Sequence, residues 1–265
     1  MQGLQNKAGD YVSGSYIGVD LKRSAKLNVD PILELKHIIG YTPDKCLNLK
    51  WSKYNNENAV IFTSGGTLIS MDVNQNNQKR FFFGHSAPIV CFDINANGTL
   101  VASAQEGKNS IIRIWEYASG RCISMLTMPV NKLNCLAFSY DFRYLASVGK
   151  DSHNREMIIV WDISKITKGE KPEIVAKQTS DFNILCIKFS PIDSSRLASC
   201  GKENIRFWRI RDNGSIRGSA VVLNHHARNT VFTSLDFEYG ARSVDPKENE
   251  SLKRLFVGSK HGMVF

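Results

Sequence analysis

The sequence predicts an all-β fold, a β-propeller with about five blades present in an incomplete ring. Three observations lead to this prediction. Trp115, Trp161 and Trp208 each close an apolar, β-branched run, and they lie 46 and 47 residues apart. Strand-like runs separated by turn residues precede each of these closing runs. Helical periodicity is absent, and short strands recurring about every 45 residues are typical of propeller blades.

Each repeat is expected to contain three short strands followed by an outer fourth strand. The first strands are predicted at 47–52, 89–94, 133–139, 184–190 and 232–237. The second strands are predicted at 58–66, 99–105, 144–150, 196–202 and 254–260. The closing runs lie at 66–72, 110–116, 157–162, 204–209 and 261–265. Residues 120–126 and 172–178 read as outer strands, and Asn97-Gly98 is expected to form a type I′ hairpin turn.

The domain organisation follows from the repeats. Residues 1–32 lack periodicity and are predicted to be a flexible N-terminal linker, and the propeller is predicted to occupy 33–265. The run at 32–41 is interpreted as an outer strand of a neighbouring blade. The repeats are predicted at 42–83, 84–128, 129–178, 179–224 and 225–265, the last one truncated. Because a ring of this kind usually closes with about seven blades, the chain is expected to be part of a longer protein.

Composition limits the classes of partner. The net charge of +9 favours an acidic partner: nucleic acid, an anionic membrane or an acidic protein surface. Nucleic acid is not favoured, because the chain has no long Lys/Arg run and no interleaving of arginine with aromatic residues. No stretch has the length of a membrane span, and the first residues lack a signal-peptide core. The six cysteines, without a C-x-x-C pair, are expected to be reduced and buried.

No catalytic constellation is present, so the chain is expected not to be an enzyme. The Gly-Lys pairs at 107–108, 149–150 and 201–202 lack the earlier glycine that a phosphate-binding P-loop requires. His225 and His226 are adjacent, and neighbouring side chains diverge on a strand, which argues against a metal site. No cofactor and no metal are expected.

Gly84-His85 and Trp161-Asp162 resemble the Gly-His and Trp-Asp signature of the WD40 family. The resemblance implies a buried hydrogen-bond chain of His, Ser, Asp and Trp in each blade. The match is partial, since Pro129 and Ser180 occupy the His position in the third and fourth repeats. The candidate structural positions are His85, Ser103, Trp115, Ser147, Asp151, Trp161, Asp162, Ser199 and Trp208. Because these networks are incomplete, the blades are expected to depend more on apolar stacking.

A row of lysines is the candidate binding feature. The turn after the second strand reads LASVGK, LASCGK and LFVGSK in the third, fourth and fifth repeats, so their lysines occupy one structural position. The residues expected to face an acidic partner are Lys108, Lys150, His153, Arg155, Lys202 and Lys260. The alternative is that Gly-Lys is simply a favourable solvated turn, because isolated surface charges contribute little.

The segments LELKHIIGY, KRFFFGH, TMPVNKLNCLAFS, ASVGKDSHNREMIIVWD and ASCGKENIRFWRIRDNGSIRG resemble a narrower group. They are similar to the propeller region of the centriolar and ciliary WD repeat-containing protein 90 family. They are more distantly similar to the propellers of echinoderm microtubule-associated-protein-like and cilia- and flagella-associated proteins. The similarity extends over about 33–265. It implies a cytoskeletal protein of the cytoplasm, at the centriole, basal body or cilium, and that microtubule attachment in the centriolar family involves a separate non-propeller domain.

These observations predict a non-catalytic scaffold of the microtubule cytoskeleton that acts in centriole, basal-body or cilium assembly. Its expected partners are proteins, with tubulin or microtubules and centriolar proteins as candidates. The alternative is a general adaptor propeller, a substrate receptor or an RNA-processing scaffold, unrelated to microtubules. Salt-sensitive co-sedimentation with microtubules would favour the first, and capture of acidic peptides or RNA would favour the second.

Overall fold

Apolar, β-branched runs form the strands, and polar turns of a few residues join them into antiparallel sheets. The computed structural model describes residues 35–42, 48–75, 77–108, 110–238 and 254–265. Within this part of the chain, β5 (Ile89–Ile94) and β6 (Leu100–Gln105) are buried along their whole length. The outer strand β8 (Cys122–Thr127) is mostly accessible. Inner strands therefore read as continuous apolar runs because a neighbouring sheet covers both of their faces.

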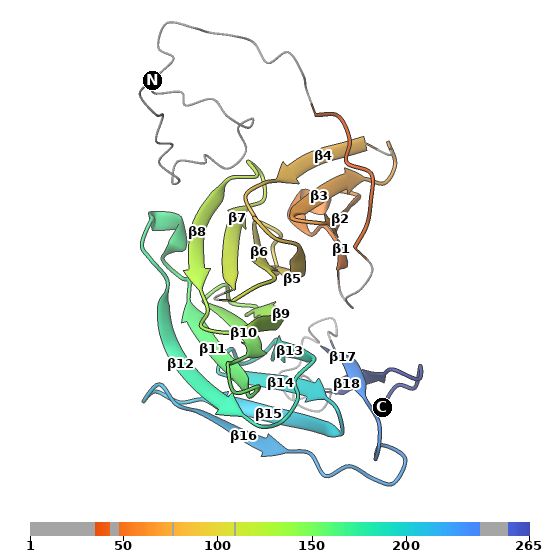
Figure 1. The fold of residues 1–265 in the computed structure, drawn as a ribbon, viewed down its shortest axis with the longest axis vertical. Helices are drawn as coiled ribbons and strands as arrows, with labels where there is room; N and C mark the ends of the chain where they lie inside the picture. Colours follow the sequence, from red (N-terminus) through yellow and green to blue (C-terminus); the bar gives the residue numbers. More distant parts are fainter. Residues whose placement is uncertain (1–34, 43–47, 76, 109, 239–253) are drawn as a thin grey trace, which may run out of the picture.

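Four complete blades and part of a fifth follow one another along the chain, and in each the strands are hydrogen-bonded in chain order (Figure 1). Blade 1 contains β1 (Leu49–Trp51), β2 (Ala59–Ser64), β3 (Thr67–Asp72) and β4 (Asn77–Phe82). Blade 2 contains β5, β6, β7 (Ile111–Glu116) and β8. Blade 3 contains β9 (Lys132–Phe138), β10 (Tyr144–Lys150), β11 (Glu156–Asp162) and β12 (Glu173–Ser180). Blade 4 contains β13 (Cys186–Phe189), β14 (Arg196–Gly201), β15 (Asn204–Ile210) and β16 (Ile216–Ala220). Blade 5 contains β17 (Phe232–Phe237) and β18 (Leu255–Ser259).

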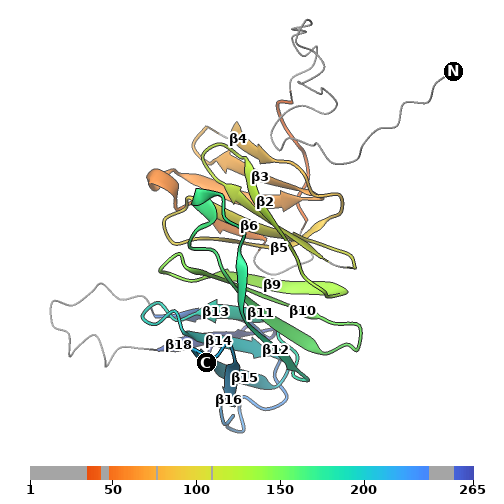
Figure 2. The same cartoon turned by 90° about the vertical axis from the view of Figure 1, so that its left-hand side faces the viewer.

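The blades are arranged as a fan, with the first strands on the inside and the fourth strands on the outside (Figure 1). Turned by 90°, the sheets are seen stacked one above another (Figure 2). The only helices among the described residues are two single 3-10 turns, η1 (Tyr54–Asn56) and η2 (Ile166–Lys168). The predicted all-β propeller with an open ring is confirmed for the described residues.

The core consists of four apolar clusters, and each lies between two successive blades. The cluster between blades 1 and 2 includes Phe82, Trp115 and Tyr117. The next two clusters are centred on Trp161 and on Trp208. The cluster between blades 4 and 5 includes Phe232. Each tryptophan that marks the repeat therefore contributes to the interface between two blades.

A row of charged residues also connects the blades through their inner strands. Lys50, Asp93, Ala137, Lys188 and Asp236 occupy equivalent registers, each opposite a residue of the second strand. Lys50 forms an ion pair with Asp93, and the other carboxylate oxygen of Asp93 accepts a 2.8 Å hydrogen bond from the Phe138 backbone N–H. Lys188 Nζ lies 3.8 Å from Asp236 Oδ1. In this row, the inner charge ladder, the four charges alternate in sign with the neutral Ala137 between the second and the third, and ion pairs join blade 1 to blade 2 and blade 4 to blade 5.

Asp93 is the most buried carboxylate of the ladder. Burial opposes ionisation of Asp93, but the positive charges of Lys50 and Lys188 outweigh this and hold its pKa below the usual value. Burial likewise works against the charge on Lys188, while Asp93 and Asp236 raise its pKa. The charged forms are therefore mutually dependent, and loss of Asp93 would leave two lysines without their shared partner.

Three local predictions need revision. The Asn97-Gly98 turn is not type I′, because only Gly98 has a positive φ (+74°) and its N–H bonds to the Asn95 carbonyl at 3.0 Å. A Cβ on Gly98 would lie 2.2 Å from the Tyr54 backbone nitrogen, so the turn needs glycine to approach blade 1. A type I turn closed by a left-handed glycine meets this need.

The run expected as an outer strand at 32–41 forms no strand in its described part, 35–42. It is instead held by the side chain of Gln78, which accepts from the Ile38 N–H at 2.7 Å and donates to the Ile38 carbonyl at 2.8 Å. The final run forms no named strand but contacts β18: Val257 and Phe265 exchange two backbone hydrogen bonds, and the Ser259 N–H donates to the Met263 carbonyl at 2.8 Å. The predicted linker, 1–32, lies outside the described residues.

Replacing Asp93 with alanine is expected to lower the free energy of unfolding by about 3–5 kcal/mol, because it leaves buried lysine charge uncompensated. Asp236→Ala is the matched control at the end of the ladder, where the side chain is 68% exposed, and should cost no more than about 1 kcal/mol. Urea unfolding followed by circular dichroism measures both. Equal losses in the two variants would contradict the role given to the ladder.

Candidate protein-binding face

A continuous hydrogen-bond chain crosses blade 2. Trp115 Nε1 donates to Ser103 Oγ at 2.7 Å, and Ser103 Oγ lies 2.7 Å from His85 Nε2. His85 Nδ1 lies 3.0 Å from Gln105 Oε1, an acceptor, so Nδ1 carries the proton and Nε2 accepts from Ser103. Gln105 Nε2 then donates to Ser86 Oγ at 3.1 Å. Gln105 therefore has the role in this chain that the WD40 resemblance assigns to an aspartate.

Blades 3 and 4 keep only the serine–tryptophan bond of this chain. Trp161 Nε1 donates to Ser147 Oγ at 2.9 Å, and Trp208 Nε1 donates to Ser199 Oγ at 2.7 Å. Ser147 Oγ donates a hydrogen bond to the Ile159 carbonyl at 3.2 Å. With no histidine available, the indole and the serine satisfy each other inside the blade.

The two predicted aspartates act within turns. Asp151 accepts from the backbone N–H groups of His153 and Arg155 at 2.8 and 2.9 Å, and Arg155 Nη2 lies 3.0 Å from its Oδ2. These bonds, led by the Arg155 N–H, lower the pKa of Asp151. Asp162 accepts from the Ser164 N–H at 2.9 Å and from Arg143 Nε at 3.3 Å. Burial alone would raise the pKa of Asp162, but the hydrogen bonds from these donors, Ser164 first, outweigh it and hold the pKa below its usual value. Each aspartate therefore fixes a turn without reaching the tryptophan.

Glu156 joins blades 3 and 4 and was missed from the sequence. Its carboxylate is buried and accepts from Asn134 Nδ2 at 2.9 Å and Asn183 Nδ2 at 3.2 Å. Burial raises the pKa of Glu156 despite these donors. A glutamate at the start of a strand gave no signal in the repeat pattern, because its two partners lie in other strands and connections.

The turns after the second strands and the connections that lead into each first strand lie on one face, which we call the turn face. Backbone hydrogen bonds tie these two sets together: Asn131 donates to Lys150, Glu203 to Thr230, and Lys260 to Val231. Lys150, Lys202 and Lys260 each lie five residues after the leucine that starts the aligned segment, so the predicted common position holds in the strand registers. Lys202 and Lys260 are exposed, and Lys150 is half-buried.

The registers place Glu106, and not Lys108, at the corresponding position of blade 2. Ser103 pairs with Arg113 as Ser199 pairs with Arg206, so the residue three places after the serine is Glu106. Lys108 is exposed in the same turn, two residues later. His153 is 75% exposed, whereas the charge of Arg155 is already shared with Asp151.

Further basic residues share this face and were missed from the sequence. Lys132 pairs across the strands with Lys150, and Arg228 lies in the connection before blade 5. Both are exposed. Among the described residues, Glu106 and Glu203 are exposed acids of the same turns. The face is therefore basic with acidic interruptions. The sequence alone could not assign Lys132 and Arg228 to it, because their assignment depends on where the connections lie in space.

Within the described part of the chain, no group of three His, Cys, Asp or Glu side chains is arranged to hold a metal ion. In the same residues, none of the helices is long and apolar enough to span a membrane. Among the described cysteines, Cys135, Cys186 and Cys200 carry free thiols.

The recurring four-stranded blades and their serine–tryptophan bonds define a β-propeller of the WD40 type. Residues 78–244 match the family described as the echinoderm microtubule-associated protein first beta-propeller. The chain belongs to that family.

Individual relatives agree with this assignment. WD repeat-containing protein 90 from Xenopus tropicalis is 32% identical over 240 residues, which cover 90% of this chain and 12% of the relative. Centriole proteome protein 16 from Chlamydomonas reinhardtii is 30% identical over 89% of this chain and 12% of its own length. Human echinoderm microtubule-associated protein-like 2 is 26% identical over 87% of this chain and 35% of its own length. The chain thus spans about an eighth of the first two relatives, and the resemblance predicted from the sequence is confirmed.

Acid is expected to destabilise the fold through His85. Burial lowers the pKa of His85 from 6.5 to about 4, so between these pH values the unfolded chain binds a proton that the folded chain does not. Stability should therefore fall as the pH decreases through this window, by about 3 kcal/mol in total. In the His85→Gln variant, the decrease in the free energy of unfolding between pH 7 and pH 4 should be smaller by about that amount, as measured by urea unfolding.

The exposed His153→Gln variant is the control for that measurement and should lose as much stability in acid as the parent protein. If His85→Gln and the parent lose stability equally, the hydrogen-bond chain through His85 does not hold the neutral imidazole.

Proposed function

We propose that the chain is a non-catalytic propeller scaffold of the microtubule cytoskeleton that contributes to centriole, basal-body or cilium assembly. The observation that carries this proposal is the similarity of nearly the whole chain to proteins named for the centriole proteome and for microtubule association. Similarity to cilia- and flagella-associated protein 52 from Mus musculus, 26% identical over 67% of this chain, supports the same setting.

The turn face is the proposed contact with acidic protein surfaces, with tubulin as the first candidate. Lys108, Lys202 and Lys260 are exposed on it, and the chain carries a net charge of +9. A basic face raises the rate of encounter with an acidic partner and makes binding sensitive to salt. The rigid blades below would hold these charges at fixed separations, because each turn is bonded to the neighbouring connection.

The polar residues inside the blades support a scaffold role. His85, Ser103 and Gln105 form a chain in which each donor has an acceptor, and burial keeps His85 neutral. Asp151 and Asp162 are both occupied by turn N–H groups. These groups therefore maintain the fold and leave none of the predicted polar residues poised as a nucleophile and base.

Reversing the lysine charges is expected to weaken attachment to microtubules. The variant Lys108→Glu/Lys150→Glu/Lys202→Glu/Lys260→Glu should bind at least about tenfold more weakly in a co-sedimentation assay at low salt, since several favourable charge contacts become repulsive. Raising the ionic strength should release the parent protein from the pellet.

The matched control reverses four basic residues in the turns between third and fourth strands, at the opposite ends of those strands: Arg121, Lys165, Lys168 and Lys171. It has the same net charge as the lysine variant and should pellet nearly as well as the parent. If both variants lose binding equally, the interaction depends on total charge and not on the turn face. If the parent does not pellet even at low salt, direct tubulin binding by these blades is excluded.

A further inference from the structure

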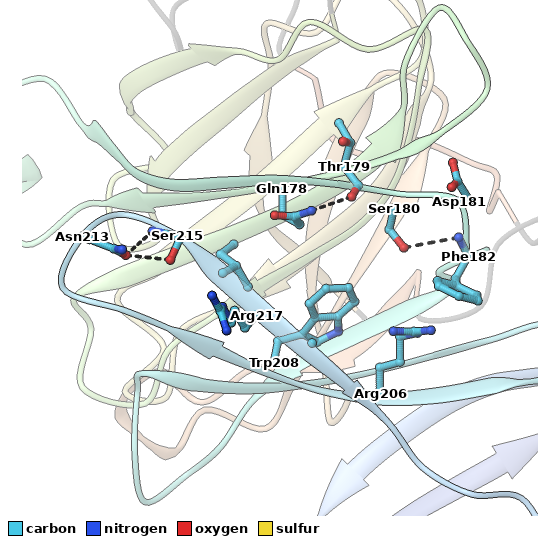
Figure 3. Close-up of a pocket in the computed structure, with 12 residues that line it drawn as sticks. Gln178, Thr179, Ser180, Asp181, Phe182, Arg206, Trp208, Asn213, Ser215 and Arg217 are labelled. Atoms are coloured by element: carbon cyan, nitrogen blue, oxygen red, sulfur yellow. Dashed lines mark hydrogen bonds between the residues drawn. The ribbon is translucent and has the colours of Figure 1, made fainter.

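A groove opens between blades 3 and 4 at the outer edge of the fan, and one end of it reaches residues 181–182 in the connection before β13, which belongs to the turn face. We call it the rim groove, and its volume is about 620 Å³. One wall is the end of β12 with the connection that follows it, and the other is formed by β15, β16 and the turn between them (Figure 3). Its lining residues are 178–182, 206, 208, 213 and 215–218.

Arg206 in the rim groove has unused hydrogen-bonding capacity. Its guanidinium carbon lies 3.5 Å from the centre of the Phe182 ring, so the planar head is held against an aromatic face. Its Nε is buried, and no described residue accepts a hydrogen bond from it. Burial lowers the pKa of Arg206, and no opposing contribution from a carboxylate accompanies this. A preorganised guanidinium without an anion is a recognition element for planar carboxylates.

In blade 2, the arginine at the position of Arg206 is enclosed by its own blade. Arg113 pairs with Ser103 as Arg206 pairs with Ser199. Arg113 Nε, like Arg206 Nε, has no acceptor among the described residues, but Arg113 Nη1 lies 3.7 Å from Cys122 Sγ, and the head also packs near Gly84.

Gly218 takes the place of Cys122 in blade 4, since these residues are opposite Trp208 and Trp115 in the registers. A Cβ on Gly218 would lie 2.6 Å from the Trp208 indole, so the ring occupies the space of the missing side chain. The outer strand therefore offers Arg206 no sulfur or other side chain at this position, and the groove remains open beside it.

The charge of the groove favours an acid. Arg206 and Arg217 both line it, and no ion pair involves either of them within the described residues. Asp181 is the only carboxylate of the lining. The groove is also bounded by β12 and β16, which are the last strands of their sheets and have a strand partner on one side only. Strands of this kind can take up an extended peptide through backbone hydrogen bonds.

We propose that the rim groove binds an extended acidic peptide segment of a partner protein, with a carboxylate of that segment on Arg206. The lining contains none of the turn-face lysines, although residues 181–182 belong to a connection of that face, and the proposal does not depend on microtubule binding. The Phe182 ring orients the guanidinium, and Arg217 adds positive charge at the other end of the groove. A neutral peptide of the same shape would leave Arg206 without an anion and would bind more weakly.

The test uses a fluorescein-labelled octapeptide of alternating glutamate and threonine, with a glutamine–threonine octapeptide as the neutral probe. Fluorescence anisotropy should show at least tenfold tighter binding of the acidic peptide. Arg206→Met, which keeps the length of the side chain, should weaken binding of the acidic peptide at least tenfold. Arg209→Met, on the same strand but outside the groove lining, should change it by less than twofold.

A second measurement locates the contact in the unaltered protein. The indole N–H resonance of Trp208 should shift on titration with the acidic peptide, and it should still shift in the variant with the four turn-face lysines reversed. Binding that leaves this resonance unmoved and is abolished by the lysine reversals would overturn the proposal, because the peptide would then occupy the turn face. Binding of a phosphoserine–threonine peptide without binding of the glutamate peptide would also overturn it.

Discussion

The need to cover both faces of every inner strand determines this structure. A sheet such as blade 2, with β5 and β6 buried throughout, would expose apolar surface on two sides if it were alone. Stacking against a blade on each side removes that surface from water, and the four apolar clusters are the result. Trp115, Trp161 and Trp208 are large enough to fill three of these interfaces, and the N–H group of each is satisfied by a serine of the same blade.

This rigid interior leaves recognition to the periphery. Hydrogen bonds between the turns and the connections fix the lysines of the turn face relative to the core. At the rim, the outer strands are less completely covered, and the substitution of one small residue opens a groove beside Arg206. The two proposed contacts therefore differ in kind: one is a broad charged face, and the other is a local pocket with an oriented guanidinium.

The repeat pattern was sufficient to predict most of the strands and the succession of blades. Strand periodicity and the tryptophan spacing report burial directly, which explains this success. The pattern could not identify Gln105 or Glu156, because their roles depend on partners brought close by the ring. It could not show that Glu106 occupies the equivalent position in blade 2, two residues before Lys108, because an alignment of a turn does not show which residue follows the strand register. The rim groove arises between two blades, so neither repeat alone predicts it.

The inner charge ladder has a consequence for how such a chain can be rearranged. Its sign sequence from blade 1 to blade 5 is positive, negative, neutral, positive, negative. Exchanging blades 2 and 4 would place Lys188 beside Lys50 and Asp93 beside Asp236, and both new neighbours would repel. The blades share one architecture, but the charges at the ladder position favour the present order over this exchange. Duplication or shuffling of these modules is therefore constrained by charge at the centre as well as by the apolar fit between the sheets.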